Sequence, residues 1–166
     1  FFSKSVVYIC EHEKNGAMGL IVNKKLDNPE LNKIIDKLFK VDKYFNTFKS
    51  NTFFGGPVLL EKGIILHHSN YSSSKSISIS KSISITSDQD ALGDLKKEGG
   101  APFKIILGHA GWFGGQLERE IKNGDWLIQN TTSDFIFNLP PNEMWEHAAR
   151  SIGLDINSNL GTPGQA

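Results

Sequence analysis

The sequence predicts an α+β fold with a mixed or mainly antiparallel sheet. Segments with the pattern of strands outnumber segments with helical periodicity, and several follow one another closely enough to form hairpins. The chain has 166 residues, 39% hydrophobic and 22% charged, which is typical of a soluble chain that buries a core. We therefore expect residues 1–166 to form a single domain.

The first expected elements are a strand pair and a helix. Residues 5–10 (SVVYIC) and 17–24 (AMGLIVNK) have strand patterns, and the turn-prone EHEKNG between them predicts a hairpin. Asn28 can cap a helix and Pro29 suits its first position. Four apolar residues then recur at helical spacing: Leu31, Ile34, Ile35 and Leu38. They predict a helix at about 29–39.

The middle of the chain predicts short strands separated by breaks. Two glycines and a proline interrupt FFGGPV (53–58), and GIILHH (63–68) follows as a strand. In the serine-rich segment 69–87, KSISIS recurs as KSISIT, and its isoleucines share one face of an extended chain. Lys81 shares that face too. We therefore expect two short strands, or one strand broken by a turn or bulge.

The last third of the chain predicts a short helix, three strands and a final helix. Three apolar residues mark the short helix: Ala91, Leu92 and Leu95. FKIIL (103–107) is apolar enough for a central strand, and DWLIQ (125–129) with DFIFN (134–138) predicts a hairpin. PNEMWEHAARSIG predicts a helix that ends at Gly153, and residues 154–166 form a weakly patterned tail.

Charge and cysteine content narrow the class of protein. Lysine plus arginine and aspartate plus glutamate both total 18, and this balance does not favour binding to nucleic acid or anionic membrane. No apolar run reaches the roughly 18 residues of a membrane-spanning helix, and the opening FFSKSVVYICEH shows no signal peptide. The single cysteine, Cys10, fits a reducing compartment. We expect a cytoplasmic protein without a membrane partner.

The stretch GHAGWFGGQLEREI (108–121) is the densest candidate for a site. It lies between a predicted strand and a predicted helix, where glycine-rich turns can present backbone amides to a phosphate. Its glycines have neither GxGxxG spacing nor the Lys-Ser/Thr of a P-loop. The alternative is a structural turn in which glycine permits positive φ and close packing around Trp112, and the spacing favours this interpretation.

Five polar or aromatic residues are candidates for ligand binding: Asn23, His67, His109, Trp112 and Gln116. No catalytic residue is assigned, because the chain has no GxSxG and no serine or cysteine adjoins His109. Cys10 and His12 make two possible metal ligands, which is too few for zinc, and no CxxC or HExxH is present. We therefore expect no metal site and no cofactor.

Three separated motifs resemble the YqgE/AlgH family of bacterial proteins. They are SKSVVYICEHEKNGAMGLIVNK, FFGGPVLLEKGIILHH and LGHAGWFGGQLEREIKNGDWL, followed by MWEHAARSIGLD. The resemblance covers nearly the whole chain and implies a compact α+β domain with a curved, barrel-like sheet flanked by helices. It also implies that the family's usual opening strand is missing before residue 1. For function it implies a proposed role in transcriptional regulation, without an activity or cofactor.

The leading hypothesis is a non-enzymatic protein with a regulatory role that binds a protein partner or a small ligand. The alternative is an enzyme or nucleotide-binding protein that uses residues 108–121. A weaker alternative is a transcriptional regulator that touches DNA directly, although we find no helix-turn-helix pair and no basic recognition helix.

Overall fold

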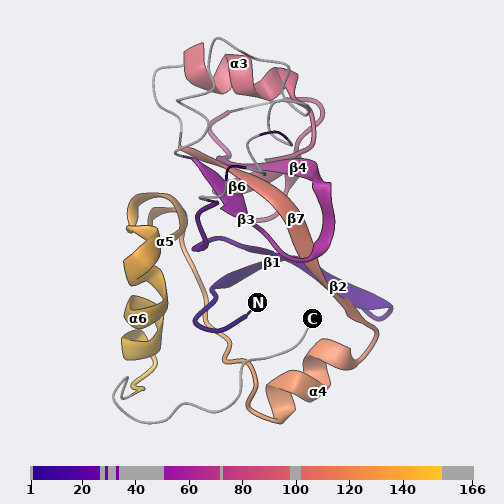
Figure 1. Ribbon diagram of the computed structural model, residues 1–166, viewed down its shortest axis with the longest axis vertical. Coiled ribbons are helices and arrows are strands. Elements are labelled where there is room, and N and C mark those ends of the chain that lie inside the picture. Colours follow the sequence, from indigo (N-terminus) through magenta and orange to yellow (C-terminus); the bar gives the residue numbers. More distant parts are fainter. Residues whose placement is uncertain are drawn as a thin grey trace.

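The protein has an α+β fold in which one sheet is flanked by helices (Figure 1). A computed structural model describes residues 2–26, 29, 33, 51–71, 73–97 and 102–154. The strands in these ranges are β1 (Val7–Glu13), β2 (Gly16–Ile21), β3 (Thr52–Phe54), β4 (Val58–His68), β5 (Ile77–Ser78), β6 (Ile83–Thr86) and β7 (Phe103–Phe113). The helices are α3 (Asp90–Lys97), α4 (Gln116–Lys122), α5 (Ser133–Asn138) and α6 (Pro141–Ser151).

Strand β7 organises the sheet. The strand order is β1-β2-β7-β4-β6-β5, and β3 pairs with β7 as well. The first half of β7 pairs antiparallel with β4 and parallel with β3, whereas its second half pairs antiparallel with β2. In Figure 1, β7 runs from beside β4 down to β2, and the sheet curves around it. The expected α+β class and the mixed, mainly antiparallel sheet are confirmed.

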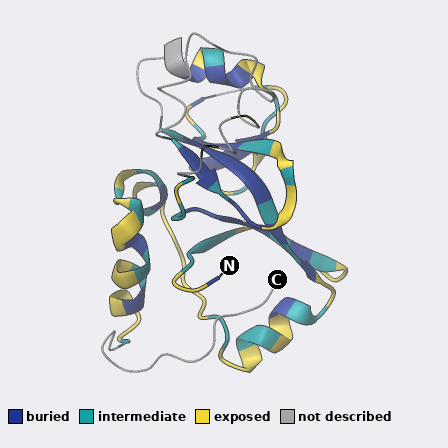
Figure 2. Cartoon of the chain, viewed as in Figure 1, coloured by how far each residue is buried: buried dark blue, intermediate teal, exposed yellow. Residues whose placement is uncertain are grey.

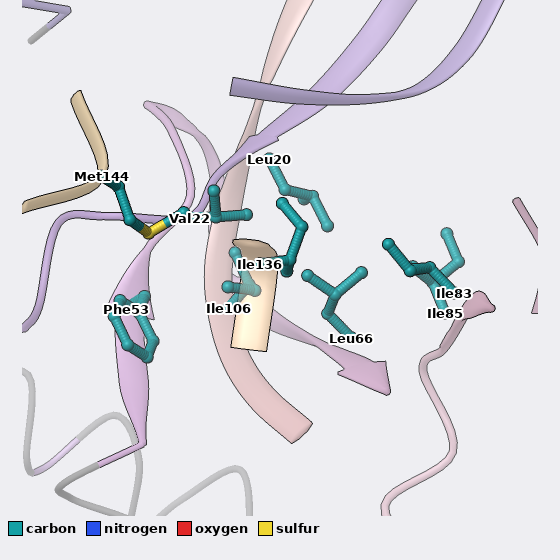
Figure 3. Close-up of a cluster of buried hydrophobic side chains, with 9 residues drawn as sticks. All are labelled: Leu20, Val22, Phe53, Leu66, Ile83, Ile85, Ile106, Ile136 and Met144. Carbon is teal, nitrogen blue, oxygen red and sulfur yellow. The ribbon is translucent and has the colours of Figure 1, made fainter. Parts of the chain in front are cut away.

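The core consists of three apolar clusters on the faces of this curved sheet. The cluster that includes α3 consists of Ile65, Tyr71, Ala91, Leu92, Leu95, Ile105 and Leu107. The cluster that includes residues of α5 and α6 consists of Leu20, Val22, Phe53, Leu66, Ile83, Ile85, Ile106, Ile136 and Met144 (Figure 3). The cluster that includes α4 consists of Phe2, Ala17, Ile21, Ala110, Trp112 and Leu117.

The alternating direction of side chains along β7 explains why other elements pack on both faces of the sheet. Ile105 and Leu107 join the cluster with α3, while Ile106 between them joins the cluster with α5 and α6. All three side chains are fully buried. Successive side chains of a strand point to opposite faces, so an apolar run of this kind requires packing on both sides. Figure 2 shows this burial along β7 and its neighbours, with exposed residues on the outer faces of the helices.

Several expected elements are confirmed. β1 and β2 form the predicted antiparallel hairpin, and the serine-rich segment contains two separate short strands, β5 and β6. The apolar face of α3 is buried as expected. Helix α6 is followed by Gly153 at φ 79°, and its N–H donates to Arg150 O, as expected for a glycine that ends a helix.

The predicted hairpin of residues 125–129 and 134–138 is wrong. Residues 126–132 have no regular secondary structure, and Ser133–Asn138 form helix α5. The Thr132 side chain caps this helix by accepting a hydrogen bond from Phe135 N at 3.2 Å. A short apolar run such as Phe135–Phe137 fits a strand or a helix equally well, and the cap decides between them.

The loop predicted from Gly108 to the next helix is also wrong in its extent. β7 continues to Phe113, and the turn consists of Gly114 and Gly115 before α4 begins at Gln116. The glycines of this stretch do not end the strand, because residues 110–113 pair with β2.

Two expected segments fall largely outside the described residues. The helix at about 29–39 is one, apart from positions 29 and 33. The tail of residues 154–166 is the other, apart from its first residue. None of the described helices is long and apolar enough to cross a membrane.

Candidate functional site

The glycines of the predicted site lie where two parts of the backbone touch. Gly55 N donates to Leu107 O at 2.8 Å, and Gly55 O accepts from Ile21 N at 2.9 Å. A Cβ on Gly56 would overlap the His109 carbonyl group, and one on Gly108 would overlap Gly56 O. Both glycines also have positive φ, at 148° and 74°. Glycine is required here because the chains cross closely, not because a ligand occupies the space.

The polar side chains that follow these glycines converge on Glu120. Its Oε2 accepts hydrogen bonds from Trp112 Nε1 at 3.0 Å and from Trp126 Nε1 at 2.7 Å. Its Oε1 accepts from Gln116 Nε2 at 3.0 Å, and Gln116 Oε1 accepts in turn from Phe113 N. This network fastens α4 to the end of β7. Sequence reasoning missed Glu120, although its place one helical turn after Gln116 is a usable signal.

The Asn23 side chain binds the backbone of the N-terminal segment. Its Oδ1 accepts from Val6 N and its Nδ2 donates to Lys4 O, both at 2.9 Å. The side chain therefore replaces backbone pairing at the point where β2 has ended and the chain before β1 passes beside it.

His67 is fully buried and anchors the serine-rich segment. Its Nδ1 lies 2.9 Å from His68 O, and because a carbonyl can only accept, this nitrogen carries the proton. Its Nε2 lies 2.9 Å from Ser76 Oγ, so the hydroxyl donates to it when the ring is neutral. The ring also meets Tyr71 edge-on, with centroids 5.2 Å apart.

The five sequence-predicted residues therefore do not form one pocket. Trp112 and Gln116 share the Glu120 network, whereas Asn23 and His67 hold other segments. His109 is half-buried on β7 opposite Val58, and burial lowers its pKa. Among the described residues, no three His, Cys, Asp or Glu side chains gather closely enough to hold a metal ion.

A groove opens elsewhere, between the chain that follows β2 and the start of α6. Its volume is about 470 Å³, and it is lined by Asn23, Lys24, Lys25, Pro141 and Asn142. Backbone bonds hold the first wall in place: Phe54 N donates to Lys24 O at 2.8 Å, and Leu26 N donates to Thr52 O at 3.0 Å. The second wall is the first turn of α6, which is fixed by the burial of Met144.

A buried lysine lies behind this groove. Lys104 of β7 is only 5% exposed, and its Nζ donates to Val22 O at 2.8 Å. The ammonium lies 4.4 Å from the centroid of the Phe53 ring and 3.9 Å from Met144 Sδ. Figure 3 shows Val22, Phe53 and Met144 together in the same part of the core.

The charge of Lys104 has no described counter-ion. No carboxylate among the described residues lies within 4.0 Å of its ammonium. Burial, with a further contribution from the Lys25 ammonium, lowers the pKa of Lys104 from 10.5 to about 8. Sequence reasoning missed this residue. The signal was a lysine in the apolar run FKIIL of a predicted central strand.

A second cavity, of about 520 Å³, lies along the outer side of α6. It is lined by Leu139, Glu143, Glu146, His147, Arg150 and Ser151. Both signs of charge are present there, and Arg150 pairs with Glu146 at 3.9 Å. This cavity therefore has less need of a charged ligand than the groove.

A model of the AlgH-like family matches residues 1–157. The chain belongs to the AlgH-like family. It is 39% identical to a UPF0301 protein of Proteus mirabilis over 169 residues, which cover 99% of this chain and 90% of that protein. It is also 39% identical to the UPF0301 protein YqgE of Salmonella paratyphi A over 171 residues, with the same coverage of each chain. The expected relationship to the YqgE/AlgH family is confirmed.

Solved structures agree with this placement in the AlgH-like family. The solution structure of the AlgH protein from Pseudomonas aeruginosa matches with a TM-score of 0.75 and 29% identity, over 98% of this chain and 86% of that one. A crystal structure from Corynebacterium diphtheriae shares the fold, with a TM-score of 0.65 and 22% identity over 90% of this chain and 78% of that one. These names state no activity, so the function has to be argued from the site.

Proposed function

We propose that this AlgH-like protein is a non-enzymatic, regulatory protein of the cytoplasm that binds a small molecule in the groove between residues 23–25 and α6. One observation carries the proposal. Lys25 and Asn142 are exposed in the groove, and neither side chain forms a hydrogen bond or ion pair among the described residues. Polar groups that converge on a cavity without internal partners are what a ligand site needs.

The corner at residues 108–121 differs from the groove because its polar side chains are bonded within the fold. Gly108 and Gly114 pack closely against the backbone of other segments, and the side chains of Trp112 and Gln116 bond to Glu120. A nucleotide at this corner would have to break these bonds. This favours the groove over the corner as the place where a ligand binds.

A single cysteine, Cys10, leaves the chain without an internal disulfide, and this supports a reducing compartment. The thiol packs against the cluster that includes α5 and α6, and burial raises its pKa to about 12. A thiol with this pKa stays protonated and is a poor nucleophile, so it behaves as a core residue.

The arrangement of the two walls of the groove supports a regulatory role. One wall is the chain that follows β2, and the other is a helix more than a hundred residues later in the sequence. A ligand that touches both walls stabilises the docked position of α6 and thereby alters the surface that this helix presents to a partner.

The test is a thermal-shift screen with sugars, amines, carboxylic acids and phosphate compounds. The proteins are wild type, Lys25→Gln and Asn142→Ala for the groove, Gln116→Ala for the corner, and Lys62→Gln as an exposed control. A ligand at a hundred times its Kd stabilises the folded state by about 2.7 kcal/mol. We expect a hit that weakens in both groove variants and persists in Gln116→Ala and Lys62→Gln. A hit lost in Gln116→Ala alone, or no hit in any class, overturns the proposal.

A further inference from the structure

We propose that the ligand of this groove is a small molecule with a phosphate group, which the Lys24 and Lys25 ammonium groups and the first turn of α6 bind, while Lys104 contributes its charge from behind. The inference rests on the proposed function and specifies the chemistry of its ligand. It concerns residues outside the glycine-rich stretch that the sequence singled out.

Positive charge is concentrated around the groove although the chain as a whole is neutral. Lys24 and Lys25 line it, and Lys104 lies behind Val22, whose carbonyl it contacts. The Lys24 ammonium donates to Ser3 O at 2.7 Å, a bond that neutralises no charge. No described carboxylate lies within 4.0 Å of these three lysines. An anion in the groove would supply the missing negative charge.

The described charges near the groove, on α6 and on the N-terminal segment, do not neutralise these lysines. Lys4 adds a further cation, which lies 5.5 Å from the centroid of the Trp145 ring. Glu143 is in the first turn of α6 but faces the second cavity, which it lines together with Arg150. The described residues that line the groove are two lysines, two asparagines and a proline, and none of these is acidic.

The start of α6 adds a backbone donor on the opposite side. Pro140 precedes the helix and no side chain caps it, while Pro141 occupies its first position and has no N–H. Glu143 N donates to Pro140 O at 3.0 Å, so the donor that this turn offers an anion is the Asn142 amide, at the positive end of the helix dipole. Asn142, which lines the groove, lies in this first turn. The lysines and the helix terminus therefore face one volume from two sides.

The number of positive groups favours phosphate over carboxylate. A carboxylate has two oxygens and one charge, and one ammonium group satisfies it. A phosphate group has three free oxygens and carries a charge of roughly −1.5 to −2 at neutral pH, so it can engage both lysines and the helix at once. The groove, at about 470 Å³, holds a phosphate group together with the small molecule that bears it.

Lys104 adds a third positive charge near the groove, although its Nζ donates to Val22 O and does not reach the groove lining. An ammonium group that is buried between Phe53 and Met144, with no counter-ion among the described residues, is less favourable than an apolar side chain at the same position. Its cost is offset when an anion binds nearby, because the two charges attract through a medium of low dielectric. Lys104 does not line the groove, so it acts as a positioning residue through its field and makes no direct contact.

The experiment is an NMR titration of ¹⁵N-labelled full-length protein at constant ionic strength. The probes are acetate, inorganic phosphate and pyrophosphate, with putrescine as a cation and glucose as a neutral compound. We expect saturable shifts of the amides of residues 23–25 and 142–144, with affinity in the order pyrophosphate, phosphate, acetate. Lys25→Gln should weaken pyrophosphate binding about tenfold, as expected for a lost charge-assisted hydrogen bond. Lys62→Gln, an exposed lysine on β4, should leave it unchanged.

Lys104→Met tests the contribution from behind the groove. Methionine keeps the length and packing of the side chain, so the amide spectrum should stay native while pyrophosphate binding weakens about fivefold to tenfold, the lower end of the usual range for a long-range coupling. Native spectra with unchanged affinity would remove Lys104 from the site. If this variant fails to fold, the Lys25→Gln titration decides the inference.

The outcomes separate this inference from the proposed function. If glucose or putrescine binds in the groove and the phosphate compounds do not, the groove is a site and the phosphate assignment is wrong. If no probe shifts these amides and the thermal-shift screen also finds no ligand, both fail. A final arm uses vesicles that contain phosphatidylglycerol and a short DNA duplex. Binding to either of these without binding to pyrophosphate would overturn the small-molecule assignment.

Discussion

The glycine corner, residues 108–121 with Gly55 and Gly56, and the groove between residues 23–25 and α6 differ in what they do with their polar groups. In the corner, the Glu120 carboxylate accepts hydrogen bonds from two indoles and an amide. In the groove, Lys25 and Asn142 have no such partners among the described residues, and the buried Lys104 has no counter-ion there.

On the proposed function, the densest sequence motif and the ligand site lie in different parts of the molecule. The corner is rich in glycine because its backbone segments cross closely at Gly56 and Gly108, and Trp112 and Gln116 are bonded to Glu120 within the fold. The groove contains no recognisable sequence motif, but its lysines have no counter-ion among the described residues. Uncompensated charge is the better indicator of a ligand, because a structural role would have supplied a partner.

The largest expected effect comes from Gly56→Ala in the corner. The new Cβ would overlap the His109 carbonyl group, and alanine is strained at φ 148°. We expect a loss of about 3 kcal/mol or more in the free energy of unfolding, as for other strained backbone positions. Urea unfolding followed by circular dichroism measures it.

Gly93→Ala is the matched control for that substitution. Gly93 lies in α3, and a Cβ there meets nothing within 4 Å. Alanine should stabilise the helix by about 0.5–1 kcal/mol, since glycine has a poor helix propensity. A Gly56→Ala protein as stable as wild type would mean that the crossing is loose, and the corner would again be open to a ligand.

The next effect concerns Lys104→Met, behind the groove. A pKa lowered from 10.5 to about 8 corresponds to a cost of roughly 3 kcal/mol for holding the charged form in the folded protein. Methionine removes that cost but leaves Val22 O without its donor, so we expect a net gain of about 1–2 kcal/mol at pH 7. Without phosphate present, the variant should therefore unfold at a higher urea concentration than wild type.

The same substitution has a signature in pH. Between about pH 8 and 10.5 the folded wild type binds fewer protons at Lys104 than the unfolded chain, so its stability rises relative to the variant. The advantage of Lys104→Met should be complete below pH 8 and shrink as pH increases to 10.5. A difference that is constant across this range would show that the Lys104 charge is already compensated, and the contrast between the two regions would disappear.

An effect of about the same size, but of opposite sign, is expected from Glu120→Ala in the corner. The substitution leaves the indole N–H groups of Trp112 and Trp126 without their acceptor, which should cost about 2 kcal/mol for hydrogen bonds to a charged group. Glu146→Ala on α6 removes an exposed pair with Arg150 and should cost at most about 0.5 kcal/mol. Indole N–H resonances report the change directly. If they do not move, the network is not what holds α4.

Much of the fold could be predicted because periodicity reports burial. The strands of the first hairpin, the split serine-rich segment and the buried face of α3 all follow from alternation or helical spacing. The pattern failed at Phe135–Phe137, where three apolar residues carry no period and the Thr132 cap selects a helix. It failed again at residues 108–113, where glycines suggested a loop although pairing with β2 continues the strand.

The proposed groove site was harder to predict because its charged residues are close together only in the folded structure. Lys25, Lys104 and Asn142 are separated by long stretches of chain, and no spacing rule connects them. Trp112 and Gln116 were predicted as site residues because they lie in a glycine-rich stretch, but their side chains donate hydrogen bonds to Glu120. A lysine inside a predicted central strand was the one available signal, because such a residue must find a partner or incur a cost.

The smallest effect concerns an exposed contact at the outer side of the corner. His12 of β1 pairs with Glu118 of α4, and this hydrogen bond, with other smaller contributions, lowers the pKa of the Glu118 carboxyl. A carboxyl with a lowered folded pKa stabilises the protein above its unfolded pKa, and that contribution is lost as pH falls through the folded value. We therefore expect Glu118→Gln to flatten the acid side of the stability profile below about pH 4.5, with His12→Ala having the same effect and the double variant adding little. Thermal unfolding from pH 3 to 6 measures this.

Because both the His12 and the Glu118 side chains are half exposed, the change should be well below that of Glu120→Ala. An equal or larger change would mean that the outer contact, and not the Glu120 network, fastens α4, and the corner would then be closed by a pair that solvent and salt can open.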